Sequence, residues 1–152
     1  RVLVLNRSYW PDVEATGQLL TELCEELARS CDVTVIAGRP NHSFEPGELA
    51  DRETRNGVSI VRVRSRRYSK NSLWSRGVGL FSYLTLSALK AFRQPRPDVV
   101  IAESDPPLLG LLGALLRRWH RCKFVNYLQD LHPEVGLALG RLRPGPLATV
   151  LK

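Results

Sequence analysis

The stretch RVLVLNRSYWPDVEATGQLLTELCEELARSCDVTVIA, residues 1–37, decides the fold of this chain. Residues 1–6 form a short apolar run bounded by polar residues, which is typical of a buried strand. Residues 17–30 follow a helical pattern, with leucines on one face and glutamates on the other, and Thr16 is predicted to cap that helix. Residues 32–37 predict a second buried strand. Strand, helix and strand in this order predict a right-handed crossover between parallel strands.

The rest of the chain continues this alternation. Further strands are predicted at residues 58–64, 98–102 and 123–127, the first of them nearer an edge of the sheet, and helices at residues 73–92 and 107–119. The polar segment 38–57, broken by prolines and glycines, is predicted to be a loop. Five strands with intervening helices predict an α/β fold, a Rossmann-like parallel sheet with helices on both faces, in a single domain over residues 1–152.

Length and composition suit one globular domain. The chain has 152 residues, of which 43% are hydrophobic and 24% charged, which favours a buried core over disorder. No signal peptide is expected, because the apolar run at residues 2–5 is too short for one. No uncharged stretch approaches the ~18 apolar residues of a membrane span. A cytoplasmic protein is therefore expected.

Cysteine usage points to a reducing compartment. Cys24, Cys31 and Cys122 form no CxxC pair, so neither a disulfide framework nor a zinc site is indicated. All three are predicted to be small buried thiols. No metal and no cofactor are expected.

The net charge of +7, with a pI near 9.8, suits a partner that carries phosphates: nucleic acid, an anionic membrane surface or a phosphorylated small molecule. One group of cations, at residues 117–123, closes the last predicted helix, where cations complement the helix dipole. The other group is equally consistent with a solvated face and with a working basic patch. Its members are Arg62, Arg64, Arg66, Arg67, Lys70 and Arg76, interleaved with Tyr68 and Trp74.

The loops that follow the predicted strands form the candidate site, because open parallel sheets bind ligands beyond the carboxyl ends of their strands. The first of these loops ends in Thr16-Gly17 at a helix start, where exposed amides attract phosphate. It has no G-x-G-x-x-G or G-K-[ST] motif, which argues against a tight dinucleotide site or a P-loop. Asp105 is predicted to be a helix N-cap rather than a catalytic residue.

The loop after residue 127 holds the densest group of reactive side chains. Gln129-Asp130-Leu131-His132-Pro133-Glu134 places three ionisable groups directly after a strand. In the functional interpretation, Asp130 or His132 lines the binding cleft. In the alternative, Asp130 forms a turn and Glu134 is a first-turn helix carboxylate. The cluster as a whole is predicted to be functional.

These segments together resemble the family 4 retaining glycosyltransferases. The similarity begins with Tyr9-Trp10-Pro11 and continues through residues 15–23, ATGQLLTEL. Residues 33–41, 96–101 and 129–134 support it, so the resemblance spans nearly the whole chain. It is greatest to the branch that makes bacterial surface polysaccharide, such as colanic-acid and O-antigen transferases. The chain departs from the family at Ser30-Cys31-Asp32, where Arg-Gly-His is common, and at Glu14, where many members have Gly.

The resemblance implies a GT-B architecture, in which two Rossmann-like domains face each other across a cleft. This chain would be the N-terminal, acceptor-side domain. A C-terminal domain with paired glutamates, which this chain does not contain, would hold most of the nucleotide sugar, so the isolated chain is expected to be inactive. The implied reaction moves a sugar, of hexosyl type, from a nucleotide diphosphate to an acceptor hydroxyl with retained configuration, and such enzymes generally need no metal.

Site residues follow from the resemblance by matching position. Thr16 and Gly17 would approach the donor diphosphate across the cleft. The expected catalytic residues are Asp130 and His132, and the expected substrate-binding residues are Thr16, Gly17, Gln129, Glu134, Arg66, Arg67 and Lys70. The basic stretch from Arg64 to Arg76, with Trp74, would meet a saccharide acceptor linked to a phosphorylated lipid, so a peripheral position on the anionic inner face of a membrane is expected.

Two other functions remain open. A sugar-nucleotide epimerase has the same two-domain form, although it should surround a buried nucleotide sugar with carboxylates and histidines. A phosphate-binding or nucleic-acid-binding module would explain the charge. The chain carries no helix-turn-helix or RNP signature, so a nucleic acid is not an expected partner.

Overall fold

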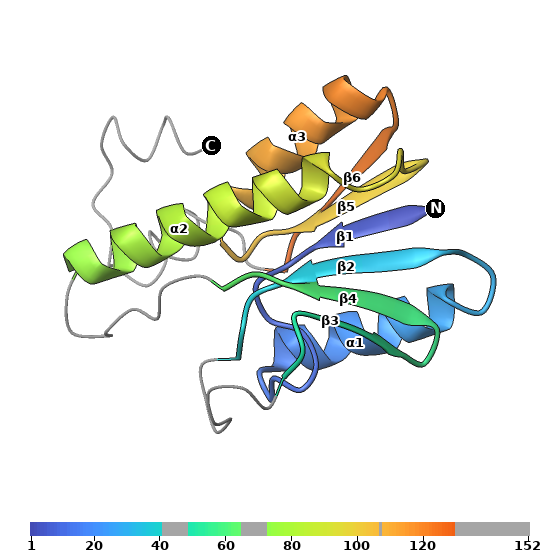
Figure 1. Ribbon diagram of the computed structural model, residues 1–152, viewed down its shortest axis with the longest axis horizontal. Helices are drawn as coiled ribbons and strands as arrows, with labels where there is room; N and C mark the ends of the chain where they lie inside the picture. Colours follow the sequence, from blue (N-terminus) through green and yellow to red (C-terminus); the bar gives the residue numbers. More distant parts are fainter. Residues whose placement is uncertain (41–48, 65–72, 107, 130–152) are drawn as a thin grey trace.

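The computed structural model describes residues 1–40, 49–64, 73–106 and 108–129, with the backbone alone for residues 73–76. These residues form one six-stranded sheet with the strand order β3-β4-β2-β1-β5-β6, flanked by three helices (Figure 1). The strands are β1 (Val2–Leu5), β2 (Val33–Ala37), β3 (Arg52–Arg55), β4 (Val58–Arg62), β5 (Val99–Glu103) and β6 (Lys123–Tyr127). The helices are α1 (Ala15–Leu27), α2 (Leu73–Phe92) and α3 (Leu109–His120).

The sheet is parallel except at one edge. β1 lies at its centre, with β2 on one side and β5 on the other, each in parallel register. β4 continues the sheet beyond β2 and β6 continues it beyond β5, again in parallel. The five predicted parallel strands and the Rossmann-like α/β class are therefore confirmed. The strand order reverses beside β1, which makes the ends of β1 and β5 the switch point of the sheet.

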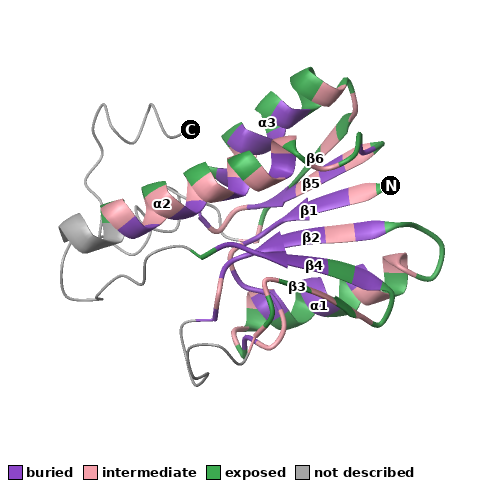
Figure 2. Ribbon diagram, viewed as in Figure 1, coloured by how far each residue is buried: buried purple, intermediate pink, exposed green. Residues whose placement is uncertain are grey.

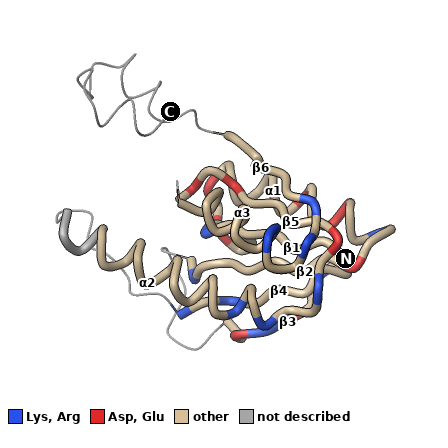
Figure 3. The backbone as a smooth tube through the Cα atoms, turned by 90° about the horizontal axis from the view of Figure 1, so that it is seen from above, with Lys and Arg blue, Asp and Glu red and all other residues tan. Residues whose placement is uncertain are grey.

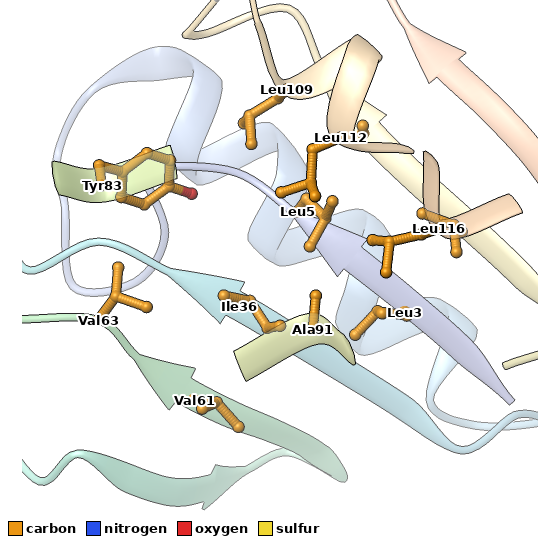
Figure 4. Close-up of a cluster of buried hydrophobic side chains, with 12 residues drawn as sticks. Leu3, Leu5, Ile36, Val61, Val63, Tyr83, Ala91, Leu109, Leu112 and Leu116 are labelled. Carbon is orange, nitrogen blue, oxygen red and sulfur yellow. The ribbon is translucent and has the colours of Figure 1, made fainter. Parts of the chain in front are cut away.

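Helices cover both faces of the sheet, as predicted. Alternate residues of β1 point to opposite faces: Leu3 and Leu5 pack under α2 and α3, and Val4 packs under α1. Figure 4 shows the cluster on the α2–α3 face, where Tyr83 and Leu112 close over the strands. β1 and β2 are buried along nearly their whole length because helices cover both sides (Figure 2).

The strand β3 lies inside the segment that the sequence predicts as a loop, so that prediction is wrong for residues 52–55. β3 pairs antiparallel with β4 through a two-residue turn at Asn56-Gly57, where φ is +46° and +82°. Asn-Gly is the preferred pair for such a hairpin turn because both positions need positive φ. The strand RETR has no apolar residue and lies at the edge of the sheet, where charged side chains are tolerated. β4 is consequently second from the edge.

Two predicted helix caps are also wrong. Glu14 occupies the N-cap of α1, and Thr16 lies within the first turn. Leu108 occupies the N-cap of α3, and Asp105, three residues before it, forms an ion pair with Arg7. The cations at the end of α3 do lie in its last turn, as the dipole argument predicts.

The cysteines differ in burial, which corrects the prediction of three buried thiols. Cys24 is buried in the α1 face of the core, Cys122 is half-buried, and Cys31 is exposed after the end of α1. Burial raises the pKa of the Cys24 thiol to about 12, so almost no thiolate forms there at neutral pH. Among the described residues, no helix has the length and apolar character needed to cross a bilayer.

We expect iodoacetamide at pH 8 to alkylate Cys31 first and to leave Cys24 unmodified in the folded protein, because alkylation needs an accessible thiolate. Peptide mass spectrometry after short labelling pulses measures the order. The same labelling in urea serves as the control, since all three thiols should then react. Early modification of Cys24 in the native protein would contradict the assigned core.

Candidate functional site

The carboxyl ends of the parallel strands meet at one edge of the sheet, and the loops that leave them form the candidate site. These loops are residues 6–14 after β1, residues 38–40 after β2, residues 63–64 after β4, residues 104–108 after β5 and residues 128–129 after β6. A cavity of about 170 Å³ lies at the opposite edge, beside Arg1, Thr34 and Pro97. It is remote from the switch point and is not part of this site.

The loop between β1 and α1 is held by side-chain hydrogen bonds. The buried Asn6 donates from its Nδ2 to the carbonyl of Ser8 at 2.6 Å and accepts the backbone N–H of Arg7 at 2.8 Å. The backbone N–H of Trp10 donates to Thr21 Oγ1 on α1 at 3.2 Å. The loop is therefore fixed against both the sheet and the helix before any ligand arrives.

Thr16 and Gly17 lie in the first turn of α1 at this edge, which is where the sequence analysis expected them. Gly17 is buried against the loop, and a Cβ on it would lie 3.4 Å from the carbonyl carbon and Cβ of Ser8. No side chain caps the helix, because the Glu14 carboxylate instead accepts the Ser8 hydroxyl at 2.9 Å. An uncapped helix start offers first-turn amides and the positive end of the dipole to an anion such as a phosphate.

Arg62, the last residue of β4, is fully buried. It is therefore part of neither a solvated face nor an exposed basic patch. Its Nη2 donates to the carbonyl of Trp10 at 2.8 Å and forms an ion pair with Glu53 on β3. The Arg55 guanidinium also lies over the Trp10 ring, 4.1 Å from its centroid. The sequence analysis missed this role because Glu53 lies on the strand that it did not predict. Arg62 thus fixes the β1–α1 loop to the β3–β4 hairpin.

A second link joins the loops after β1 and β5 at the switch point. Arg7 Nη2 donates to Asp105 Oδ2 at 3.0 Å. The N–H of Gly38, after β2, donates to the carbonyl of Arg7 at 2.9 Å, and a Cβ at Gly38 would come within 2.9 Å of that same oxygen. Only glycine fits there without a shift of the backbone. Three strand ends, those of β1, β2 and β5, are therefore bound to one another around Arg7.

Two more guanidinium groups lie at this edge, after β2 and β4. Arg39 and Arg64 both contact the carboxylate of Asp51, at 3.1 Å and 2.7 Å. The hydrogen bond from Arg64, and then that from Arg39, lower the pKa of Asp51 to about 2, so this carboxylate stays ionised at neutral pH. Two cations share one anion, which leaves the cluster with a net positive charge. The sequence analysis did not single out Arg39.

Asp12 is a further residue of the site that the sequence analysis missed. It lies in the β1–α1 loop with only 8% of its surface exposed, and within the described residues its Oδ1 has no hydrogen-bond partner. A buried polar atom without a partner costs free energy, so such an atom often marks a functional position. Its only sequence signal is its position, after a proline in the loop that follows the first strand.

The loop after β6 enters the same edge. The N–H of Gln129 donates to Ser104 Oγ at 3.1 Å, which ties this loop to the one after β5. Gln129 therefore lies beside the switch point. The other predicted site residues, Asp130, His132, Glu134, Arg66, Arg67 and Lys70, lie outside the described residues. In the part of the chain that the structure describes, no three His, Cys, Asp or Glu side chains are grouped as metal ligands would be.

The carboxyl edge thus combines an uncapped helix start, a buried carboxylate oxygen and the net-positive cluster of Arg39, Arg64 and Asp51, on loops that are held by hydrogen bonds. That set of groups suits a polar ligand with hydroxyls and phosphates. No curated protein matches the chain. A family model described as a glycosyl transferase 4-like domain matches residues 15–151, which cover most of the chain and most of the loops named above. The chain therefore belongs to the glycosyl transferase 4-like domain family, and its sheet is the Rossmann-like half of a GT-B glycosyltransferase.

Proposed function

We propose that this domain is the acceptor-side half of a retaining glycosyltransferase that builds a bacterial surface polysaccharide. The enzyme would move a hexosyl group from a nucleotide diphosphate sugar to a saccharide acceptor linked to a phosphorylated lipid. The observation that carries the proposal is the family match over residues 15–151, because it covers the first turn of α1 and the loops that follow β2, β4, β5 and β6. A second domain facing this edge would complete the cleft.

Each part of the edge has a role in this proposal. The first-turn amides at Thr16 and Gly17 stabilise the departing diphosphate, whose negative charge grows in the transition state. The loop that begins at Gln129 carries Asp130 and His132 to the sugar and the acceptor hydroxyl, where they orient the reacting oxygen and accept its proton. Glu134 binds the substrate beside them. Fixed dipoles and cations supply the charge stabilisation, so the reaction needs no metal ion or other cofactor.

The affinity for the nucleotide sugar tests which of the two proposed domains holds the donor. We expect the isolated domain to bind nucleotide sugar only in the millimolar range and to catalyse no transfer, because most donor contacts belong to the second domain. The full-length protein, with both proposed domains, should bind the same donor at least about a hundredfold more tightly. That difference corresponds to ~2.7 kcal/mol of binding free energy. Isothermal titration calorimetry on both proteins measures the difference. Equal affinities would place the donor site in this domain and would refute the acceptor-side assignment.

The basic stretch before α2 is proposed to bind the phosphates of the lipid-linked acceptor. Replacing Arg66, Arg67 and Lys70 by Ser in the full chain should raise the KM for the acceptor at least about tenfold, because each cation near an anionic group contributes ~1 kcal/mol. The KM for the nucleotide sugar and the thermal unfolding midpoint should stay unchanged. The difference in acceptor KM should also shrink at high salt, since exposed charges are screened beyond ~8 Å at physiological ionic strength. An unchanged acceptor KM would leave the stretch as a solvated loop.

A further inference from the structure

The helical layer formed by α2 and α3 has an unusual outer surface. Both helices lie on the same face of the sheet, so their outward sides face the same way (Figure 1). Large apolar side chains of these two helices are exposed to solvent. They are Phe81 (74% exposed) and Leu89 on α2, and Leu111 (62%), Leu115 (52%) and Trp119 (70%) on α3, with Leu108 just before it. We call these six residues the α2–α3 outer face.

Leu111 and Leu115 on α3 point away from the sheet, whereas Trp119 lies on the side of α2, where its ring meets that of Phe92 edge-on at 5.6 Å. Leu112 and Leu116 pack into the core, and the glycine at 113 faces β6, because a Cβ there would meet the ring of Phe124. With 3.6 residues per turn, Leu111 and Leu115 each lie about 160° around the helix from position 113. Leu111 and Leu115 therefore face solvent, on the side of α3 that is turned away from β6.

Cations predominate around this face among the described residues, with the exposed Asp98 beside them, two residues after Arg96. Neither helix contains an Asp or a Glu along its whole length. In Figure 3 the described part of α2 carries no red, the colour of Asp and Glu. Cations gather where both helices end, and the two ends lie side by side, since Arg96 Nη2 donates to the carbonyl of Arg121 at 3.4 Å. The exposed cations at these ends are Arg93, Arg96, Arg117, Arg118, Arg121 and Lys123.

The helix on the opposite face shows the contrast. α1 carries Glu22, Glu25 and Glu26 and has no Lys or Arg. Leu19 and Leu23 are exposed on α1 as well, so exposed leucine alone does not set the two faces apart. What distinguishes the α2–α3 outer face is exposed apolar surface, including Trp119, on two helices that carry cations and no Asp or Glu. Helices that lie in the headgroup region of an anionic bilayer have this combination.

We propose that the α2–α3 outer face docks on a bilayer that contains anionic lipid. The apolar side chains enter the headgroup boundary, and the cations at the helix ends meet lipid phosphates. α2 and α3 both begin at the carboxyl edge of the sheet, because each follows a strand that ends there. In this orientation the candidate site stands at the side of the domain, next to the membrane surface. The inference extends the proposed function by positioning the site for a lipid-linked acceptor, and vesicle binding tests it without any transfer assay.

Flotation of the full chain with vesicles tests the proposal. We expect the protein to float with vesicles of phosphatidylcholine and phosphatidylglycerol, and to stay at the bottom with phosphatidylcholine alone. Leu111→Ser/Leu115→Ser should lower the affinity for the mixed vesicles at least about fivefold, because two apolar anchors are lost. The matched control, Leu19→Ser/Leu23→Ser on α1, has the same spacing and should bind like the parent. Arg117→Gln/Arg118→Gln should weaken binding to the mixed vesicles and lessen its loss with salt.

Three results would overturn the proposal. The first is a parent protein that does not float with the mixed vesicles. The second is an equal loss of affinity in the α1 control and the α3 variant. The third is a parent that sediments as a dimer and an α3 variant that is monomeric, which would assign the face to a second copy of the chain. An enzyme that transfers sugar but does not float would overturn this inference and leave the proposed function standing.

Discussion

Replacing Arg62 by Met is expected to lower the free energy of unfolding by about 3 kcal/mol, the lower end of the range for breaking a buried ion pair. The guanidinium is fully buried and serves two acceptors, the Trp10 carbonyl and the Glu53 carboxylate. Methionine fills much of the space but donates no hydrogen bond, so both acceptors lose their partner. The value lies at the lower end because Glu53 keeps 23% of its side chain exposed and remains partly hydrated.

Arg64→Met provides the matched control. Arg64 lies two residues further along the chain and also pairs with a carboxylate, that of Asp51, but 70% of its side chain is exposed. Its loss should cost less than about 1 kcal/mol. Urea unfolding of the parent and of both variants, compared at constant slope, gives the two values. Similar losses in the two variants would contradict the role assigned to Arg62 as the buried link between the β1–α1 loop and the β3–β4 hairpin.

Replacing Asp130 by Asn or His132 by Gln in the full chain is expected to lower kcat for sugar transfer by about 10²–10⁴-fold, the usual contribution of a positioned acid or base. The reason is their place in the chain. Gln129 is bound to Ser104 by a 3.1 Å hydrogen bond, so the residues that follow start from the switch point of the sheet. Single-turnover and steady-state kinetics separate the effect on kcat from any effect on the KM of either substrate.

Glu26→Gln is the control for these variants. Glu26 is an exposed carboxylate in the last turn of α1, where it pairs with Arg29. It lies far from the carboxyl ends of the strands, so its replacement should leave kcat within about twofold. If both loop variants keep the parent kcat, then the turn interpretation of this loop is correct and the reacting groups lie elsewhere. A loss in kcat with an unchanged unfolding midpoint supports a catalytic role.

The elements that the sequence predicts well are those with local patterns. β1, α1 and β2 follow one another within 37 residues, and each shows its apolar period without interruption. β3 could not be found in this way, because RETR has no apolar residue and its only signal is the Asn-Gly turn after it. An edge strand is held by backbone pairing with β4, and side-chain hydropathy does not report that pairing.

The site was less accessible to sequence reasoning than the fold. The strand ends could be identified as the binding edge, because this follows from a parallel sheet alone. The pair Arg7–Asp105 joins residues 98 positions apart, and no local pattern reveals such a contact. The burial of Arg62 depends on Glu53, whose strand was not predicted. The prediction of Asp105 as a helix cap fails because its partner, Arg7, is distant in the sequence. Arg7 lies across the switch point and not in the adjacent helix.

The central claim is that this domain supplies the acceptor side of a retaining sugar transfer. The most direct measurement incubates the full chain with a radiolabelled nucleotide diphosphate sugar and a lipid-linked saccharide, and determines the anomeric configuration of the product by NMR. We expect label in the lipid-linked product, through a glycosidic bond with the same configuration as in the donor, and no label without the acceptor. Return of the label as an epimerised nucleotide sugar, or a product with inverted configuration, would refute the proposed retaining transfer.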